Sequence, residues 1–275
     1  MTHRTYFEVD GDDRSALGVQ VARQRARVLE RLRAVRQIVA IVSGKGGVGK
    51  SWVTAALANA LARNGAHTGV LDADLQSPTV ARLLGARPPL LVNDAGVHPA
   101  RGDSGVGVIS TDLLLDDGRP LAWRSGAGET HVWRGAAEAG VLREFLADVA
   151  WGEMDALLID MPPDAGRLAD LALLLPDRLT AIAVTIPSDE SARSVQRALT
   201  AAHEAGVTIL GVVENMSGYA CATCETIGPL FAGNAGPRLA AAFDVPLLAR
   251  IPFAPAGARA PVVPETLLAL FHAQR

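Results

Sequence analysis

The sequence contains few cysteines, few aromatic residues and no apolar run long enough to cross a membrane. Two of its 275 residues are cysteine, 4% are aromatic, and the net charge at pH 7 is −3. A membrane-spanning helix needs about 20 consecutive apolar residues, and no stretch approaches that length although 49% of the residues are hydrophobic. The small net charge excludes a global attraction to nucleic acid, so a nucleic-acid partner is not expected.

The amino-terminal residues also lack the apolar core of a secretory signal, because Thr2–Arg14 is polar and charged. We therefore expect a cytoplasmic protein. In a reducing compartment, two cysteines are more often metal ligands or redox groups than a structural disulfide. A chain of 275 residues can bury a substantial core, and one large domain of strands and helices is the default expectation.

A tail and a basic helix at residues 1–36 are predicted to precede the main domain at residues 37–275. Residues 1–13 are polar, and Ser15–Val35 has apolar residues at helical spacing. The helix and its flanks carry Glu30 and a set of arginines: Arg14, Arg23, Arg25, Arg27, Arg31, Arg33 and Arg36. A solvated arginine face is the favoured interpretation, and a contact with nucleic acid or membrane is the alternative.

A glycine-rich segment carries the strongest functional pattern. It follows an apolar run at residues 38–42, precedes helix-forming sequence through Ala62, and fits G-x-x-x-x-G-K-S/T, the phosphate-binding loop. The loop consists of Gly44, Lys45, Gly46, Gly47, Val48, Gly49, Lys50 and Ser51. We expect its four glycines to turn backbone N–H groups inward, because positive φ costs glycine little. Together with the positive end of the following helix, these donors predict a cradle for phosphate.

Three side chains of this loop have separate predicted roles. Lys50 is expected to bridge the terminal phosphates of a nucleotide, and the Ser51 hydroxyl is expected to ligate Mg²⁺. Lys45 is a second cation within the loop and must also lie close to phosphate charge. Spacing alone leaves open whose phosphate Lys45 meets.

Carboxylates follow two further predicted strands. Residues 67–71 form a short strand that ends in Asp72-Ala73-Asp74, and residues 155–159 form another that ends in Asp160. The carboxyl ends of parallel strands face the ligand crevice of an α/β sheet. We therefore expect Asp74 to orient an attacking water, and Asp72 and Asp160 to hold Mg²⁺ through water. A helix-capping role is the alternative for one of the aspartates at 72 and 74.

Strands and helices continue to alternate toward the carboxyl terminus. The predicted elements are a strand at 179–186, a helix at 188–205, a strand at 207–213, a helix at 234–243, a strand at 246–251 and a short helix from Pro264. This alternation predicts an α/β fold, a doubly wound and mostly parallel sheet with helices on both faces.

Two further sites follow the strand at 207–213. Asn215 is predicted to pair with the donor and acceptor edge of adenine, with a plain turn residue as the alternative. Cys221 and Cys224 lie in a predicted loop, and their thiolates suit an iron–sulfur cluster or zinc. A [4Fe–4S] cluster takes four cysteines, so two protomers would each supply one pair. A shared zinc site and a redox disulfide are the alternatives, although a redox C-x-x-C motif normally starts a helix.

Together these motifs resemble the Mrp family of iron–sulfur cluster carrier ATPases, which are relatives of MinD and ParA. The resemblance covers about residues 36–263 and rests on SGKGGVGKS, DADLQSPTVARLLG, LLIDMPPDAG and VVENMSGYACATCETIGPLFAGNAGPRLAAAF. The loop with Lys45 is the deviant form of this group, and it implies a homodimer in which Lys45 reaches the nucleotide of the facing subunit. The resemblance implies slow ATP hydrolysis with Lys45, Lys50 and Asp74 in catalytic roles. It further implies a cluster, bound by Cys221 and Cys224 between two subunits, that is transferred to apo-proteins.

Four features depart from the family pattern. Trp52 stands at a nucleotide-binding position where the family has Ser or Thr, and indole cannot replace the hydroxyl that assists the α-phosphate. Asp164 and Arg167 stand where Gly and Asp are expected. The segment after Pro252 is shorter than usual, and residues 123–130 form an insertion. These departures bear on the rate of hydrolysis and on base specificity more than on nucleotide binding.

A function of a different class stays open, a MinD- or ParA-like positioning switch that binds membrane or DNA. The membrane version needs a basic amphipathic carboxyl-terminal helix. Residues 265–275 contain several large apolar residues and one terminal arginine, so we expect this helix to pack on the core. The DNA version needs a basic dimer surface, and only the amino-terminal arginines support one. A nucleotide-regulated thiol or zinc protein is a third interpretation.

Overall fold

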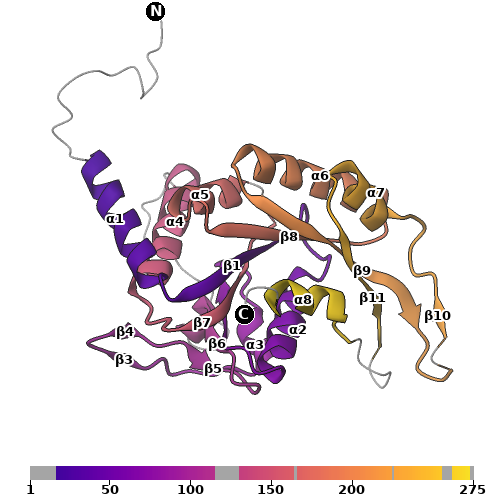
Figure 1. Cartoon of the computed structure of the whole chain (residues 1–275), viewed down its shortest axis with the longest axis horizontal. Coiled ribbons are helices and arrows are strands. Elements are labelled where there is room, and N and C mark those ends of the chain that lie inside the picture. The colour runs from indigo at the N-terminus through magenta and orange to yellow at the C-terminus, as the bar shows by residue number, and fades with distance from the viewer. Residues whose placement is uncertain (1–16, 115–129, 164–165, 225, 256–261, 273–275) are drawn as a thin grey trace, which may run out of the picture.

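The computed structural model describes residues 17–114, 130–163, 166–224, 226–255 and 262–272. Figure 1 shows these residues arranged as a central sheet with helices on both sides. The predicted polar tail, Asp164 and the insertion up to residue 129 lie outside the described residues.

The strands of the described residues are, in chain order, β1 (Val35–Val42), β2 (Thr68–Asp72), β3 (Val92–Asn93), β4 (Gly96–Val97), β5 (Ala100–Arg101), β6 (Gly107–Ile109), β7 (Met154–Asp160), β8 (Leu179–Thr185), β9 (Thr208–Ala220), β10 (Ile227–Gly228) and β11 (Leu247–Phe253). Nine of them form one sheet in the order β10-β9-β8-β1-β7-β2-β6-β5, and β11 also pairs with β9. The central pairs are parallel, whereas β5 and β10 pair antiparallel at the edges. Strand β1, which leads into the phosphate loop, therefore lies near the middle of the sheet.

The helices of the described residues are α1 (Leu17–Arg31), α2 (Lys50–Arg63), α3 (Val80–Leu84), α4 (Thr130–Asp148), α5 (Gly166–Leu174), α6 (Asp189–Glu204), α7 (Ala235–Ala242) and α8 (Glu265–His272), and a 3-10 turn spans Thr111–Leu113. Helices α1, α4, α5, α6 and α7 contribute buried side chains to one hydrophobic core, and α2, α3 and α8 to another. Figure 1 shows these two groups on opposite sides of the sheet. The predicted fold class is confirmed.

The central strands are buried on both faces, which explains why their sequences are continuous apolar runs rather than alternating ones. The last five residues of β1, β7 and β8 are all buried. Charged side chains follow at the carboxyl ends of two central strands: Asp72 is the last residue of β2 and Asp160 is the last residue of β7. The sheet thus brings charged side chains to one edge of an apolar core.

The predicted helix at 15–35 ends earlier, at Arg31, and β1 begins earlier than predicted, at Val35. Val35 is buried and pairs with Met154 of β7, so pairing in the sheet outweighs the helical spacing of the sequence. Val28 and Leu32 are fully buried in the core that α4 also lines. Helix α1 therefore packs on the main domain, and the division of the chain at residue 36 stays a prediction.

Strand β9 is longer than predicted, since it continues to Ala220 instead of ending at Val213. Its outer half pairs with Phe253 of β11 and with both residues of β10. Ser217 and Gly218 are typical of turns, so pairing with distant segments overrides the local preference here.

The carboxyl-terminal helix α8 packs on the core, as predicted. Leu267, Leu268 and Phe271 are at most 7% exposed, so the apolar face of this helix is covered by the protein itself. Across the described residues, every helix is too short or too polar to span a membrane.

Candidate functional site

The phosphate loop connects the carboxyl end of β1 to α2 and uses its glycines in two ways. Gly47 and Gly49 have φ of 81° and 80°, which is the left-handed conformation that the sequence predicts. Gly44 and Gly46 lie outside that region, so the positive-φ explanation is wrong for these two. A Cβ on Gly44 would overlap the backbone of Ser194 in α6, whereas a Cβ on Gly46 would meet open space. Gly44 is thus required by the close approach of α6.

The buried carboxylate of Asp160 gathers the functional side chains of the loop. It accepts hydrogen bonds from Lys50 Nζ at 2.9 Å, Ser51 Oγ at 2.6 Å and Thr54 Oγ1 at 2.8 Å. Asp160 is 0% exposed, so the charge of Lys50 is needed to offset its burial. The structure therefore brings Lys50, Ser51 and Asp160 together. Thr54 was missed from the sequence, although it lies four residues after Lys50 and hence on the same face of α2.

Asp72 lies beside Asp160, because β2 and β7 are parallel and pair these two residues in register. Its Oδ2 atom accepts hydrogen bonds from the backbone N–H groups of Thr79 and Val80, at 3.0 and 3.2 Å, and from Ser110 Oγ at 3.2 Å. Asp72 therefore caps the start of α3, the alternative role considered for it. Burial, and secondly the charge of Asp160, raise the pKa of Asp72 to about 7. Oxygen donors at this position also suit a hard divalent cation, and the Mg²⁺ role of Asp72 stays a prediction.

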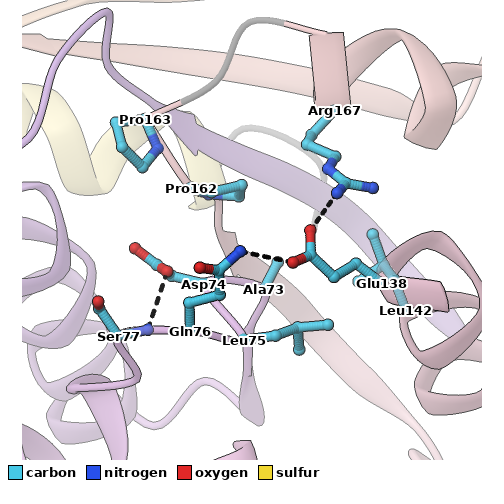
Figure 2. Close-up of a pocket in the computed structure, with 10 residues that line it drawn as sticks. All are labelled: Ala73, Asp74, Leu75, Gln76, Ser77, Glu138, Leu142, Pro162, Pro163 and Arg167. Carbon is cyan, nitrogen blue, oxygen red and sulfur yellow. Dashed lines mark hydrogen bonds and ion pairs between the residues drawn. The ribbon is translucent and has the colours of Figure 1, made fainter. Parts of the chain in front are cut away.

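Asp74 lies in the turn after β2 and lines a cavity of about 320 Å³, shown in Figure 2. Its Oδ1 atom accepts a hydrogen bond from the backbone N–H of Ser77 at 3.2 Å. The cavity is also lined by Gln76, Glu138 and Arg167. Asp74 thus faces an accessible space at the carboxyl end of the sheet, and its role in orienting water stays a prediction.

Glu138 of α4 ties the turn after β2 to the start of α5. It accepts a hydrogen bond from Gln76 Nε2 at 2.6 Å, and its other carboxylate oxygen forms an ion pair with Arg167. Both side chains of the pair are largely buried, at 12% and 16% exposure. The sequence identified Arg167 as a departure from the family pattern but carried no signal for Glu138. Glu138 is 62 residues from Gln76 and 29 from Arg167, and such separations do not indicate which helix crosses this turn.

Two other loop-associated residues differ in their surroundings. Lys45 is exposed, so its ammonium group is accessible to a partner. Trp52 is half-buried and lines a second cavity of about 610 Å³, between α2 and the start of α8. The roles of Lys45 at a facing nucleotide and of Trp52 beside the α-phosphate stay predictions.

Asn215 of β9 contacts the phosphate loop directly. Its Nδ2 atom donates a hydrogen bond to the backbone carbonyl of Val48 at 2.9 Å, and the residue is 5% exposed. A Cβ on Gly49 would overlap the same Nδ2 atom. Asn215 therefore positions the loop, which the sequence did not suggest, and its pairing with adenine stays a prediction.

Cys221 and Cys224 lie at the exposed tip formed by β9 and β10. Both are free thiols, Cys221 half-exposed and Cys224 exposed. The backbone N–H of Cys221 donates to the carbonyl of Thr226 at 3.0 Å, which closes the turn. The Cys224 thiol hydrogen-bonds the Thr226 hydroxyl at 3.4 Å, and this contact, followed by the Thr226 backbone and the Cys221 side chain, lowers the pKa of Cys224. A lowered pKa favours the thiolate, the form that binds metal.

Large apolar side chains are exposed on β9, β10, β11 and the residues that follow β10, and we call them the tip patch. Its members are 37–60% exposed and comprise Tyr219, Ile227, Leu230, Phe231 and Phe253. The rings of Tyr219 and Phe253 are stacked, with centroids 6.3 Å apart. Clustered exposed apolar residues mark interaction surfaces more often than isolated ones do.

Comparison with known proteins places this chain in a family. Residues 34–261 match the family described as ParA, NUBPL iron-transfer P-loop NTPase. The chain is 38% identical to an iron-sulfur cluster carrier protein of Saccharolobus solfataricus over 88% of this chain and 79% of that one. It is 37% identical to the human cytosolic Fe-S cluster assembly factor NUBP2 over 82% of each chain.

Solved structures agree with these matches. A nucleotide-binding protein from Archaeoglobus fulgidus in complex with ADP is 32% identical, with a TM-score of 0.67 over 90% of both chains. The cell division ATPase MinD of Pyrococcus furiosus is 25% identical, with a TM-score of 0.50 over 78% of this chain and 83% of that one. The resemblance drawn from the motifs is confirmed. With a family match that spans most of its length, the chain belongs to the NUBPL iron-transfer P-loop NTPases.

Proposed function

We propose that this protein is a nucleotide-dependent carrier of an iron–sulfur cluster. It binds ATP with Mg²⁺ at the phosphate loop, hydrolyses it slowly, and holds the cluster on Cys221 and Cys224 for transfer to apo-proteins. The observation that carries the proposal is the exposed pair of free thiols at the tip of β9, in a chain whose other site has the side chains of a nucleotide-binding loop. The names of the similar carrier and assembly proteins support it, and the name of the human relative supports a cytoplasmic location.

The residues at the loop fit a nucleotide with a divalent cation. Ser51, Asp72 and Asp160 offer oxygen donors within one small region, and Mg²⁺ prefers oxygen ligands. We assign direct ligation to Ser51 and water-mediated contacts to the two carboxylates. When bound, the cation neutralises phosphate charge. Lys50, which pairs with Asp160 at 2.9 Å, can turn its ammonium group to the terminal phosphates.

Hydrolysis requires an oriented water and further neutralisation of charge. Asp74 is the carboxylate that we assign to the water, because it faces the cavity at the carboxyl end of β2. Lys45 is the second cation, and its exposure suits a nucleotide held by a facing subunit. The Asp74→Ala variant is expected to keep nucleotide affinity and lose turnover, measured by calorimetry and phosphate release. Turnover at the parent rate would remove Asp74 from the mechanism.

The cluster is the cargo of the protein, and its ligand set requires two protomers. Thiolates are soft ligands that suit iron–sulfur clusters, and a [4Fe–4S] cluster takes four of them, whereas the sequence has two cysteines. A homodimer joined at the two tips supplies four thiolates. The exposed apolar side chains of the tip patch offer surface that such a contact can bury, and burial of apolar surface favours association.

Anaerobic reconstitution with iron and sulfide tests the carrier function. We expect about four irons per dimer and a broad visible absorption band, both lost in Cys221→Ser and in Cys224→Ser. Thr223→Ser, an exposed change within the same turn, is the matched control and should keep both. Iron that stays bound in the double Cys221→Ser, Cys224→Ser variant would exclude the cysteine pair as the cluster site. Stoichiometric zinc, with no iron taken up, would support the zinc alternative instead.

A further inference from the structure

We propose that Asn215 and Met216 are positioning residues that couple nucleotide occupancy of the phosphate loop to the geometry of the cysteine pair. This coupling rests on the proposed function, because it needs both the nucleotide and the thiolate site. One continuous strand, β9, passes through both sites: Asn215 touches the loop, and Cys221 follows the end of the strand at Ala220.

Asn215 and Met216 of β9 pack tightly against the phosphate loop. Asn215 Nδ2 donates to the carbonyl of Val48 at 2.9 Å, and the space above Gly49 is filled by the same amide. The Met216 side chain also approaches Gly49, since its Cε would lie 3.6 Å from a Cβ there. Because the interior is close-packed, a shift of the Val48 and Gly49 backbone cannot occur without moving these two side chains.

The backbone changes character immediately after Asn215. Met216 has φ of 52°, the left-handed region that residues other than glycine rarely adopt. At the same point the pairing with β11 slips: Asn215 pairs with Ile251 and Tyr219 pairs with Phe253, so four steps along β9 match two along β11. Irregularities of this kind re-aim a strand and gather next to functional sites. Backbone strain that the surrounding structure holds in place is one physical basis of two-state elements.

Beyond Met216, β9 acts as an arm that carries the thiols. The five residue steps from Met216 to Cys221 span roughly 17 Å at the usual rise of a strand. Pairing with β10 and the stacked rings of Tyr219 and Phe253 stiffen this arm. A change in the backbone dihedral angles of Met216 therefore displaces Cys221 and Cys224. Met216 lies between the two sites and is the point at which this motion originates.

Coupling between two sites is reciprocal, and it changes affinity typically by about 5- to 150-fold. Co²⁺ is a suitable probe of the cysteine pair, because thiolate-to-cobalt absorption reports metal on sulfur and not on oxygen. We expect the affinity for Co²⁺, read from this band, to change at least about 5-fold when ADP and Mg²⁺ are saturating. Met216→Gly removes the backbone strain, and we expect it to reduce the ratio of the two affinities to below about 2-fold while the Co²⁺ affinity without nucleotide is retained.

Asp177→Gly is the matched control. Asp177 also has a positive φ, 58°, but lies in the connection between α5 and β8, so the ratio should stay as in the parent. Met216→Asn, which also tolerates the left-handed region, serves if the glycine variant does not fold. Asn215→Asp, which cannot donate to the Val48 carbonyl, should likewise bring the ratio toward one.

The outcomes separate this coupling from the carrier function itself. A parent protein that binds Co²⁺ on its thiolates with the same affinity with and without ADP overturns the coupling and leaves the carrier function standing. If Met216→Gly and Asn215→Asp show the same ratio of Co²⁺ affinities with and without ADP as the parent, the proposed role of these residues is overturned. The absence of any thiolate band in the parent removes both the carrier function and the coupling.

Discussion

Asp72 should make the nucleotide-free protein less stable at alkaline pH than at acidic pH, and Asp72→Asn should remove this dependence. The carboxyl group is 1% exposed and lies beside the charge of Asp160. Burial and that charge raise the pKa of Asp72 from 3.8 to about 7. Asparagine has the same shape, and its carbonyl can still accept the hydrogen bonds from the backbone of Thr79 and Val80.

The sign follows from proton linkage. Between pH 4 and pH 7 the folded protein keeps the proton on Asp72, whereas the unfolded chain has released it, so the free energy of unfolding falls as pH rises. The difference between a pKa of 3.8 and one of about 7 corresponds to roughly 4 kcal/mol. The resulting decrease in the free energy of unfolding is absent below about pH 4 and fully present above about pH 7. Other carboxylates contribute opposite slopes, so the difference between parent and variant is the quantity to measure.

Urea unfolding at pH 5, 6, 7 and 8, without Mg²⁺ or nucleotide, gives that difference. We expect Asp72→Asn to gain stability relative to the parent as the pH rises, by roughly 2.5 kcal/mol between pH 5 and pH 8, because part of the total effect is already present at pH 5. Ser110→Ala is a second arm, because the Ser110 hydroxyl hydrogen-bonds Asp72 at 3.2 Å and lowers its pKa. Its loss should raise that pKa further and shift the decline of stability to higher pH. A stability difference between Asp72→Asn and the parent that is the same at pH 5 and pH 8 would refute this account of Asp72.

Three further outcomes are expected. Lys50→Ala should weaken ATP binding roughly 10- to 150-fold in calorimetry, since a hydrogen bond to a charged group contributes about 1.5–3 kcal/mol. Lys45→Ala, a change at an exposed residue, should keep the parent affinity for ATP and lose hydrolysis. Equal losses of ATP affinity in the two variants would contradict the separate roles of the two lysines. Trp52→Thr should tighten ATP binding by a similar factor, because threonine restores a hydroxyl beside the α-phosphate; unchanged affinity would mean that this phosphate is held elsewhere. Gly44→Ala should lower the free energy of unfolding by about 3 kcal/mol or more, because the added Cβ overlaps the backbone of α6. Gly46→Ala should change the free energy of unfolding, measured in urea, by less than about 0.5 kcal/mol.

The sequence alone determined the phosphate loop, the strand before it and the helix after it. It also determined the alternation of apolar strands and helices that predicts an α/β fold, which the structure confirms. These features depend on residues close together in the chain: the spacing of glycines and lysines in a short loop, and runs of apolar residues that suit strands buried on both faces. The placement of Asp72 and Asp160 at strand ends was local in the same sense, and their meeting followed from parallel pairing of those strands.

Only the tertiary structure decided how these pieces contact one another. It showed that Gly44 is required by α6, about 150 residues away in the chain, that Asn215 holds the loop through Val48, and that Glu138 joins Gln76 to Arg167. It also decided that β9 runs on to the cysteine pair, although Ser217 and Gly218 locally favour a turn. The raised pKa of Asp72 is likewise a property of its burial beside Asp160. Spacing along a chain carries no information about such distances, because contacts between remote segments are set by how the strands and helices pack.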